Sequence, residues 1–377
     1  MSKIAILTLP LHANFGGNLQ AYAMQKILRN LGHDAYLLNI QNYKKSNLYF
    51  ILKQIIRKFL FFRNEYQLSY DENLIVNQNH RNFIYKYIPL TKEIYDLKQL
   101  NFIFENEGFE AVIVGSDQVW RSIYTPSIET YFLDFLEKNN EIKKIAYAAS
   151  FGIDTWDYSQ PITDKLSLLA KKFNYLGVRE DSAVVLCKEN LGVNAKHVLD
   201  PTLLLSQNDY LDLINLELTK NGTEIFSYIL DSSKFKSEII KLVSLQLNKK
   251  DFSIQIKKIN KTSIKLSNAE DYIVPTIESW LVSFRDTRFI ITDSFHGMVF
   301  SILFNKNFIV ISNKERGATR FSSLLKLLNL ENRLIDEKTD LNVVRLLIKD
   351  PIDYVSVNAK LGSMRSKILD DLKAVLS

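Results

Sequence analysis

The segment from Thr292 to Gly297 reads TDSFHG and places a histidine where acid–base chemistry or anion binding could take place. Apolar residues precede and follow it, which predicts a strand and then a helix. Asp293 or Ser294 would cap that helix, so His296 would stand in its first turn beside unpaired N–H groups and the positive dipole end. Gly297 would leave room for a ligand. We interpret His296 as a proton donor or acceptor, with a packed core histidine as the alternative.

Two more segments place charged side chains at the ends of predicted strands. VIVGSDQVWR runs from an apolar strand into Asp117, and LGVREDS runs from a strand into Arg179. Ligands of α/β sheets bind beyond the carboxyl ends of the strands, so both residues are candidates for a ligand site. The structural alternatives are a turn cap for Asp117 and a surface ion pair with Asp181 for Arg179.

Paired glycines follow the first predicted strand, in the segment LPLHANFGGNLQAYA. Gly16 and Gly17 would let the backbone approach a ligand closely, and a helix beginning at Asn18 would offer N–H groups to an anion. The pattern is not a complete G-x-G-x-x-G fingerprint, and a tight turn is the alternative.

Further candidates lie in two loops. KERGATRF follows the strand after the histidine helix, so its arginines, Arg316 and Arg320, would overhang the same cleft. In VLDPTLLL, Pro201 restricts Asp200 to extended geometry at a domain exit, which suits a structural role as well as a chemical one.

The elements that must position these residues alternate between strand and helix patterns, which predicts parallel sheets covered by helices. The expected strands are 3–9, 34–40, 110–116, 144–150, 175–180, 195–200, 224–230, 252–259, 288–293 and 307–312. They form two doubly wound α/β domains. We expect an N-terminal domain over 1–205, a C-terminal domain over 206–352 and a helix over 353–377 that packs back on the first domain. The default ligand site is the cleft between the domains.

Composition narrows the classes of function. The chain has 377 residues, 46% of them hydrophobic, and a formal net charge of +6. Its one cysteine, Cys187, excludes an internal disulfide framework and a thiolate metal cluster, and a cytoplasmic setting is the default. The first residues read as a strand rather than a signal peptide. We find no nucleic-acid-binding motif, no metal-ligand cluster and no apolar stretch of about 18 residues.

One segment indicates contact with a membrane surface. Residues 43–63, YKKSNLYFILKQIIRKFLFFR, hold six basic residues and no acidic one, interleaved with Leu, Ile and Phe. On a helix this gives an apolar stripe flanked by cations, as in interfacial helices, and we expect peripheral contact at the inner face of the membrane. The alternative is a helix packed on the domain with a solvated basic face.

Taken together and in order, the motifs resemble the polysaccharide pyruvyl transferase family. The segments that carry the resemblance are NFGGNLQAYA, VIVGSDQVW, YAASFG, GVREDSA, LDPTLLL, TDSFHGMVFSILFNK and NKERGATRFSSLLKLL. The resemblance implies two Rossmann-like domains arranged as in GT-B glycosyltransferases. It also implies transfer of a pyruvyl group from phosphoenolpyruvate, as co-substrate, to sugar hydroxyls of a cell-surface polysaccharide or its precursor. The product is a cyclic ketal, and no cofactor or metal is needed.

The resemblance also implies roles for individual residues. Phosphoenolpyruvate carries a carboxylate and a phosphate, so its site needs arginines and helix N-termini. The donor residues would be Arg179, Ser294, Gly297, Arg316 and Arg320. Some relatives have an arginine at the position of Ser294, and Arg316 or Arg320 would substitute for it. We assign proton delivery or phosphate stabilisation to His296 and hydroxyl activation to Asp117. The acceptor residues would be Asn14, Gly16, Gly17, Asn18 and Gln118.

Two other classes of function share this two-domain plan. One is a nucleotide-sugar glycosyltransferase, although the absence of a D-x-D motif argues against the metal-dependent type. The other is a non-catalytic, two-lobed glycan-binding protein, which would normally be exported. The sequence leaves open the acceptor sugar, the pair of hydroxyls that is bridged and whether the acceptor is linked to a lipid.

Overall fold

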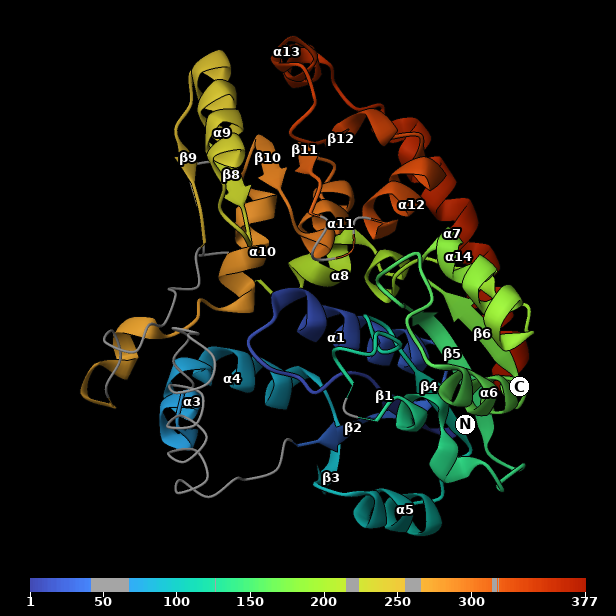
Figure 1. Ribbon diagram of the computed structural model, residues 1–377. Coiled ribbons are helices and arrows are strands. Elements are labelled where there is room, and N and C mark those ends of the chain that lie inside the picture. The colour runs from blue at the N-terminus through green and yellow to red at the C-terminus, as the bar shows by residue number, and fades with distance from the viewer. Residues whose placement is uncertain (42–67, 126, 215–223, 255–265, 314–316, 318) are drawn as a thin grey trace.

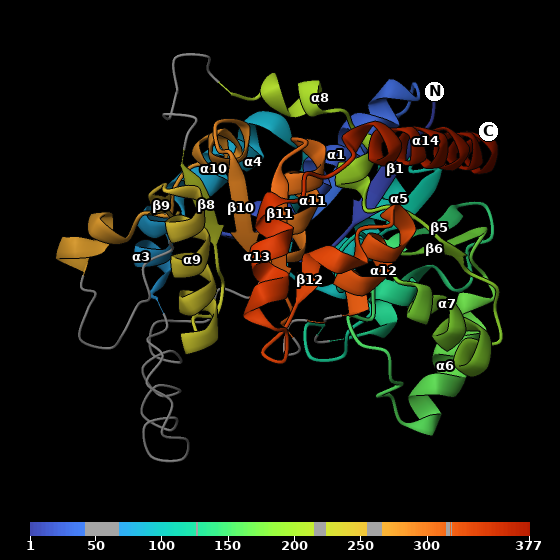
Figure 2. The same cartoon turned by 90° about the horizontal axis from the view of Figure 1, so that it is seen from above.

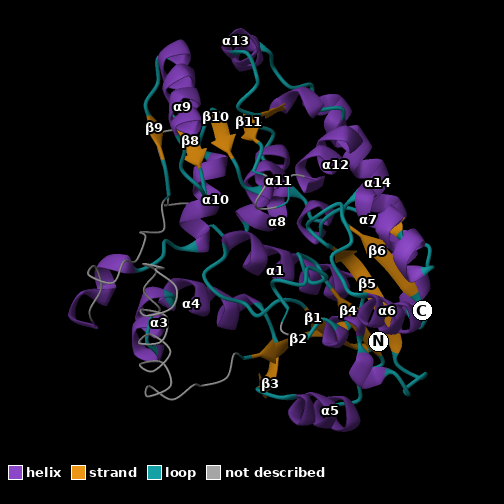
Figure 3. Cartoon of the chain, in the orientation of Figure 1, coloured by secondary structure: helices purple, strands orange, loops and turns teal. Residues whose placement is uncertain are grey.

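The computed structural model describes most of the chain. The described residues are 1–41, 68–125, 127–214, 224–254, 266–313, 317 and 319–377. They form two parallel β-sheets flanked by helices (Figures 1 and 3). The expected fold class, two α/β domains, is confirmed. The segment 43–63 and Arg316 lie outside the described residues.

The first sheet has seven parallel strands in the order β3-β2-β1-β4-β5-β6-β7. Its strands are β1 (Lys3–Leu7), β2 (Asp34–Ile40), β3 (Leu90–Ile94), β4 (Ala111–Val114), β5 (Lys143–Ala149), β6 (Tyr175–Val178) and β7 (Lys196–His197). The central strands are fully buried because helices cover both faces, and they are therefore continuous apolar runs such as AVIV in β4. The α-helices of this part are α1 (Phe15–Asn30), α3 (Tyr70–Val76), α4 (Gln78–Tyr87), α5 (Leu97–Asn106), α6 (Gln160–Ala170) and α7 (Asp181–Leu186). Shorter helical turns are η1 (Glu129–Phe132), η2 (Asp134–Leu136), η3 (Cys187–Leu191) and η4 (Pro201–Leu204).

The second sheet has five parallel strands in the order β12-β11-β10-β8-β9. Its strands are β8 (Ile225–Tyr228), β9 (Asp251–Phe252), β10 (Phe289–Thr292), β11 (Asn307–Ile311) and β12 (Leu334–Ile335). The α-helices here are α8 (Gln207–Leu211), α9 (Lys234–Leu247), α10 (Ile277–Arg285), α11 (Phe295–Leu303), α12 (Thr319–Leu328), α13 (Leu341–Lys349) and α14 (Tyr354–Leu376), with turns η5 (Leu266–Tyr272) and η7 (Glu331–Arg333).

The expected elements differ from the observed ones mainly at their ends. The helix expected from residue 18 begins at Phe15, because the Asn14 side chain caps it by accepting a hydrogen bond from Gly17 N at 3.1 Å. Strand β3 was not expected. Strand β9 is only two residues long, and residues 255–259 of the strand expected over 252–259 lie outside the described part of the chain.

Apolar packing fixes the first domain against the second. The rings of Phe15 in α1 and Trp280 in α10 stack with centroids 5.4 Å apart, and both side chains are fully buried. Nearby, Asn79 Nδ2 donates to the carbonyl of Val274 at 2.8 Å. These contacts hold the first turn of α1 close to the second domain.

The long helix α14 also joins the two domains, and Figures 1 and 2 show it running from the second domain along the first. Lys196 Nζ lies 2.8 Å from Asp371 Oδ2, and Arg365 donates to the carbonyl of Leu203. Leu372 on its apolar face is fully buried. The expected domain limits at 205 and 352 stay predictions.

Among the described residues, no helix is long and apolar enough to span a membrane.

Candidate functional site

His296 lies in the first turn of α11, as expected, and Ser294 rather than Asp293 is the N-cap. Ser294 Oγ accepts a hydrogen bond from Gly297 N at 3.3 Å. The His296 side chain is 10% exposed and rests against the first turn of α1. A methyl group at residue 16 would lie only 2.1 Å from His296 Nδ1, so the ring fits there because residue 16 is glycine. Two helix N-termini, one from each domain, therefore meet at this imidazole.

Asp117 follows β4 with a backbone φ of 74°, a left-handed conformation that residues with a side chain adopt infrequently. This turn directs the carboxylate toward two arginines: Oδ1 lies 3.3 Å from Arg179 Nη2 and 3.9 Å from Arg320 Nη1. Burial alone would raise the pKa of Asp117, but the charges of Arg179, His296 and Arg320 outweigh it and lower the pKa. The side chain is 14% exposed, so an ionised carboxylate reaches the surface of the site.

The two guanidinium groups come from different domains and share one aromatic ring. Arg179 follows β6, Arg320 lies in α12, and their Cζ atoms lie 4.7 and 5.3 Å from the centroid of the Phe295 ring. Burial, and then repulsion from Arg179, lowers the pKa of Arg320 to about 10. Asp117 Oδ1 already lies between the two guanidinium groups, and a further anion beside Arg320 would offset more of this repulsion. The pair is suited to a ligand with several negative charges.

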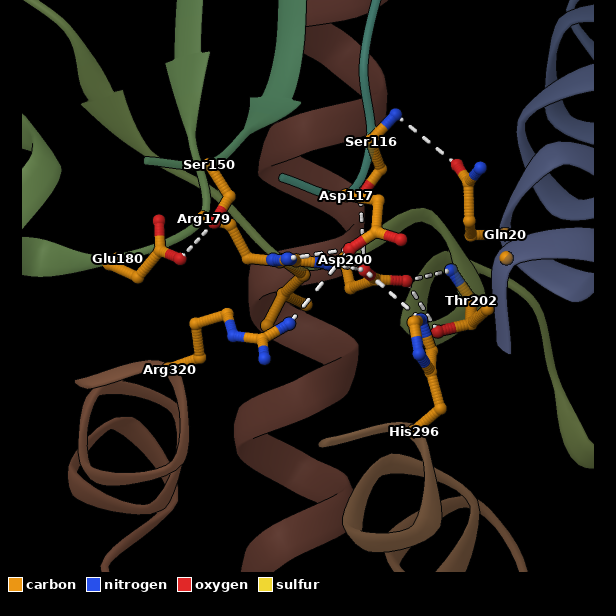
Figure 4. A network of polar contacts seen from close by, with 12 residues as sticks. Gln20, Ser116, Asp117, Ser150, Arg179, Glu180, Asp200, Thr202, His296 and Arg320 are labelled. Atoms are coloured by element: carbon orange, nitrogen blue, oxygen red, sulfur yellow. Dashed lines mark hydrogen bonds and ion pairs between the residues drawn. The ribbon is translucent and has the colours of Figure 1, made fainter. Parts of the chain in front are cut away.

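These charged residues form a cluster that comprises Asp117, Arg179, Glu180, Asp200, His296 and Arg320. Asp200 lies at its centre and is fully buried. Its Oδ1 accepts hydrogen bonds from the backbone N and the hydroxyl of Thr202, at 3.0 and 2.6 Å. Its Oδ2 accepts from Ser116 Oγ and from Arg179 Nη1, both at 3.0 Å, and lies 3.7 Å from His296 Nε2 (Figure 4). Asp200 thus bonds to Ser116, Arg179 and Thr202 of the first domain and faces His296 of the second domain.

A third carboxyl group, that of Glu180, lies behind Arg179. Glu180 is 1% exposed, and Oε1 accepts a hydrogen bond from Ser150 Oγ (Figure 4). Its other oxygen, Oε2, has no hydrogen-bond partner among the described residues. Burial raises the pKa of Glu180 above its ordinary value, against the opposing charge of Arg179.

This arrangement can be compared with known proteins. The family model described as polysaccharide pyruvyl transferase matches residues 14–315, which include every residue of the cluster except Arg320. The chain belongs to the polysaccharide pyruvyl transferase family. A search of curated proteins gave no match.

Solved structures show the fold to which this family member is similar. The structure of MnaA from S. aureus with UDP shares 14% identity, with 100% of this chain and 97% of that chain covered and a TM-score of 0.52. The UDP-GlcNAc 2-epimerase of Methanocaldococcus jannaschii also shares 14% identity, with 93% of each chain covered and a TM-score of 0.48. The first similarity supports two Rossmann-like domains in a GT-B-like arrangement, and it concerns the fold alone.

The remaining predicted residues of this family member lie around the cluster with evident structural roles. A methyl group at Gly297 would lie 2.2 Å from Thr292 Oγ1, so packing on β10 already accounts for this glycine. Asn18 is fully buried, and its Nδ2 contacts the carbonyl of His12 and the ring of His80. These contacts explain why both residues are buried, and their assignments to donor and acceptor binding stay predictions.

Gln118 and Gly17 lie at the edges of the site. Gln118 Oε1 accepts from Arg121 Nη1 at 2.7 Å, and its side chain packs on Gly152, where a methyl group would lie 2.0 Å from Oε1. Gly17 donates its backbone N–H to the cap residue Asn14. Their assignment to acceptor binding stays a prediction.

Two residues of the cluster were not among the predicted site residues. Asp200 was considered as a residue before a proline that suits a structural or a chemical role, and Glu180, in the segment LGVREDS, was given no role. Both stand at the carboxyl end of a strand, as Asp117 and Arg179 do, and that shared position is the signal that could have identified them. Within the part of the chain that the structure describes, no group of three His, Cys, Asp or Glu side chains could hold a metal ion.

Proposed function

We propose that the protein transfers a pyruvyl group from phosphoenolpyruvate to two hydroxyls of a sugar, forming a cyclic ketal on a cell-surface polysaccharide or its precursor. The observation that carries this proposal is the meeting of Arg179, Arg320 and His296 between the two domains, beside the ionised Asp117. Two guanidinium groups match the carboxylate and the phosphate of the donor. Membership of the polysaccharide pyruvyl transferase family supports the same reaction.

The proposed reaction needs one acid, one base and stabilisation of the departing phosphate. A proton adds to the methylene carbon of phosphoenolpyruvate, and C2 becomes electrophilic. One sugar hydroxyl adds to C2, the bond from C2 to the phosphate oxygen breaks, and a second hydroxyl closes the ketal at C2. The two sugar hydroxyls lose two protons in total. One replaces the proton that was added to form the methyl group, and the other leaves with the phosphate. Arg179 and Arg320 would hold the donor while His296 handles a proton or stabilises the phosphate.

Asp117 would activate the sugar hydroxyl. Its lowered pKa keeps it ionised but makes it a weak base while both arginines face it. A donor anion that competes for Arg320 would weaken this interaction, which is the longer of the two at 3.9 Å. The carboxylate would thus become more basic once the donor is bound, and hydroxyl activation would follow donor binding.

The test is a reaction of the purified protein with phosphoenolpyruvate and candidate saccharides. We expect release of phosphate together with a mass gain of about 70 units in the acceptor, the increment of a pyruvyl ketal. In thermal unfolding, phosphoenolpyruvate should stabilise the protein and UDP-sugars should not. Stabilisation by a UDP-sugar alone would favour a glycosyltransferase, and stabilisation by free oligosaccharides alone would favour a glycan-binding protein.

The acceptor and the place of action are proposed from the sequence alone. We propose a cytoplasmic enzyme whose segment 43–63 contacts the inner face of the membrane, where a lipid-linked acceptor would be presented. Replacing Lys53, Arg57 and Lys58 together by glutamate should weaken binding to anionic vesicles while leaving transfer to a soluble acceptor unchanged. Unchanged vesicle binding would contradict the membrane role.

A further inference from the structure

Asp200 has surroundings that a turn residue before a proline does not require. One oxygen, Oδ1, satisfies the turn by accepting from Thr202. The other, Oδ2, accepts from Ser116 and Arg179 and faces His296 of the second domain. The carboxylate is therefore hydrogen-bonded to residues of the first domain and faces His296 of the second domain.

His296 Nε2 lacks a hydrogen bond within the described part of the chain, although it is buried. Its distance of 3.7 Å from Asp200 Oδ2 is too long for a hydrogen bond, but an approach of about 0.7 Å would form one. A buried polar nitrogen without a partner is unfavourable, so closure of the domains around a ligand would gain this bond. The other charged or titratable groups of the cluster are Asp117, Arg179, Glu180 and Arg320.

The two ring nitrogens of His296 face different surroundings. Nε2 faces a carboxylate, which only accepts hydrogen bonds and so favours a proton on that nitrogen. Nδ1 rests against Gly16 at the N-terminus of α1, a helix of 16 residues whose positive end attracts anions. A phosphate bound at this helix end would meet Nδ1 and not Nε2.

We propose that Asp200 is a positioning residue that fixes a proton on His296 Nε2 and leaves Nδ1 as the nitrogen that acts on the ligand. This inference deepens the function proposed above and depends on it for the identity of the ligand. In the protonated ring, Nδ1–H donates to the phosphate oxygen as the bond from C2 breaks, the phosphate leaves carrying that proton, and the neutral ring keeps its proton on Nε2. Asp200 holds its own charge throughout.

The first experiment concerns the parent protein and needs no substrate. With ¹⁵N-labelled histidine, the two ring signals of His296 are identified among the five histidines by their loss in His296→Asn. At a pH where the ring is neutral, we expect Nε2 to carry the proton and Nδ1 to be unprotonated. A proton on Nδ1 instead would overturn the proposal.

The second experiment removes the charge of Asp200 and keeps its shape. In Asp200→Asn, the side-chain amide can donate as well as accept a hydrogen bond, so the preference for a proton on Nε2 should be lost and the ¹⁵N signals of His296 should show a mixture of the two neutral forms. Phosphate release should fall by about 10²-fold. A folded variant that keeps the proton on Nε2 alone would contradict the role.

The matched control is Asp350→Asn, which removes a carboxylate paired with the buried Arg333 at 3.0 Å. Asp350 caps the end of α13, and none of its described contacts is with His296, so the protonation of His296 and the rate should stay at parent values. Asp200→Glu restores the charge and should return the proton to Nε2. These measurements distinguish the two proposals: a protein that does not use phosphoenolpyruvate can still show the expected protonation, and an active enzyme with a proton on Nδ1 refutes only the role of Asp200.

Discussion

Gly16 of the first domain and His296 of the second are in contact: a methyl group at residue 16 would lie 2.1 Å from Nδ1 and 2.2 Å from Cγ of the imidazole. Gly16 lies in α1 and His296 in α11, so the first turns of two helices meet here. The site therefore exists only while the two domains keep this arrangement, which Phe15 and Trp280 hold by stacking one residue away.

Gly16→Ala should displace His296 and reduce activity without unfolding the protein. The added methyl group overlaps the ring, so the ring must move by about 1 Å, a displacement that can cost about 10²-fold in rate. Steady-state kinetics on the folded variant measure this loss. The matched control is Gly362→Ala on α14, where a methyl group meets no described atom within 4 Å. That change should stabilise the helix by about 0.5–1 kcal/mol and leave kcat unaltered. Parent activity in Gly16→Ala would show that the contact is unimportant.

Arg320→Gln should weaken donor binding much more than it changes stability. Burial and the charge of Arg179 lower the pKa of Arg320, so the positive charge of Arg320 is unfavourable in the folded protein. Glutamine is uncharged and removes this unfavourable contribution to the free energy of folding. Losing a charged hydrogen bond to an anion costs about 1.5–3 kcal/mol, and KM for phosphoenolpyruvate should rise by at least about tenfold.

The buried Arg333 provides the contrast for that prediction. It donates to the carbonyl of Leu347 at 2.9 Å and pairs with Asp350, outside the candidate site. Arg333→Gln should therefore lower the free energy of unfolding by about 1–3 kcal/mol and leave KM at the parent value. An Arg320→Gln variant that behaves like Arg333→Gln would assign Arg320 a structural role only.

The fold could be predicted further than the site because its signals are local. Continuous apolar runs such as Ala111–Val114 identify buried parallel strands from a few neighbouring residues. Strand β3, Leu90–Ile94, was missed because its sequence LTKEI is half polar, as suits an edge strand with exposed residues. The start of α1 was placed three residues late because paired glycines normally oppose helix formation, and only the contact with His296 shows why Gly16 stands inside one.

The site itself depends on contacts between distant residues. His296, Asp117, Arg179 and Arg320 were each predicted from their place after a strand or in a loop over the cleft, and the structure brings these four together. Asp200 is 84 residues from Ser116 and 21 from Arg179 along the chain, and no local pattern relates them. The role of Asp200 can be recognised only in the tertiary structure, because its hydrogen-bond partners come from separate segments of the chain.

Glu180→Gln should stabilise the protein by an amount that grows with pH. Burial raises the pKa of Glu180, so the folded state binds its proton more tightly than the unfolded chain does. Such a group stabilises the fold fully below its unfolded pKa, near 4.5, and this contribution is lost as pH rises through the folded pKa. Glutamine does not titrate and avoids the loss.

Urea unfolding of parent and Glu180→Gln at about pH 4 and about pH 8 measures this dependence. The exposed Glu337 provides the control, since Glu337→Gln should change stability equally little at both pH values. A difference between parent and Glu180→Gln that is the same at both pH values would show that folding does not shift the pKa of Glu180, and would contradict the prediction.

The last prediction concerns His296 itself. In His296→Asn the protein should fold and bind phosphoenolpyruvate nearly as the parent does, while kcat falls by about 10²-fold to 10⁴-fold, the usual range for a lost general acid or base. The pH profile of the parent should carry a limb in the neutral range that this variant loses. Neither Asp117 nor Asp200 can supply that limb, because the net effect of their surroundings lowers both pKa values.

Glu180 is the other group of the cluster whose raised pKa moves it toward neutral pH, so Glu180→Gln is the matched comparison for that limb. If His296 handles the proton, the limb persists in Glu180→Gln and disappears in His296→Asn. If it disappears only in Glu180→Gln, the proton belongs to the carboxyl group behind Arg179. A folded His296→Asn protein that keeps most of its activity would refute the role of the imidazole, because a packed, uncharged ring at the start of α11 can be replaced by asparagine with a cost to stability alone.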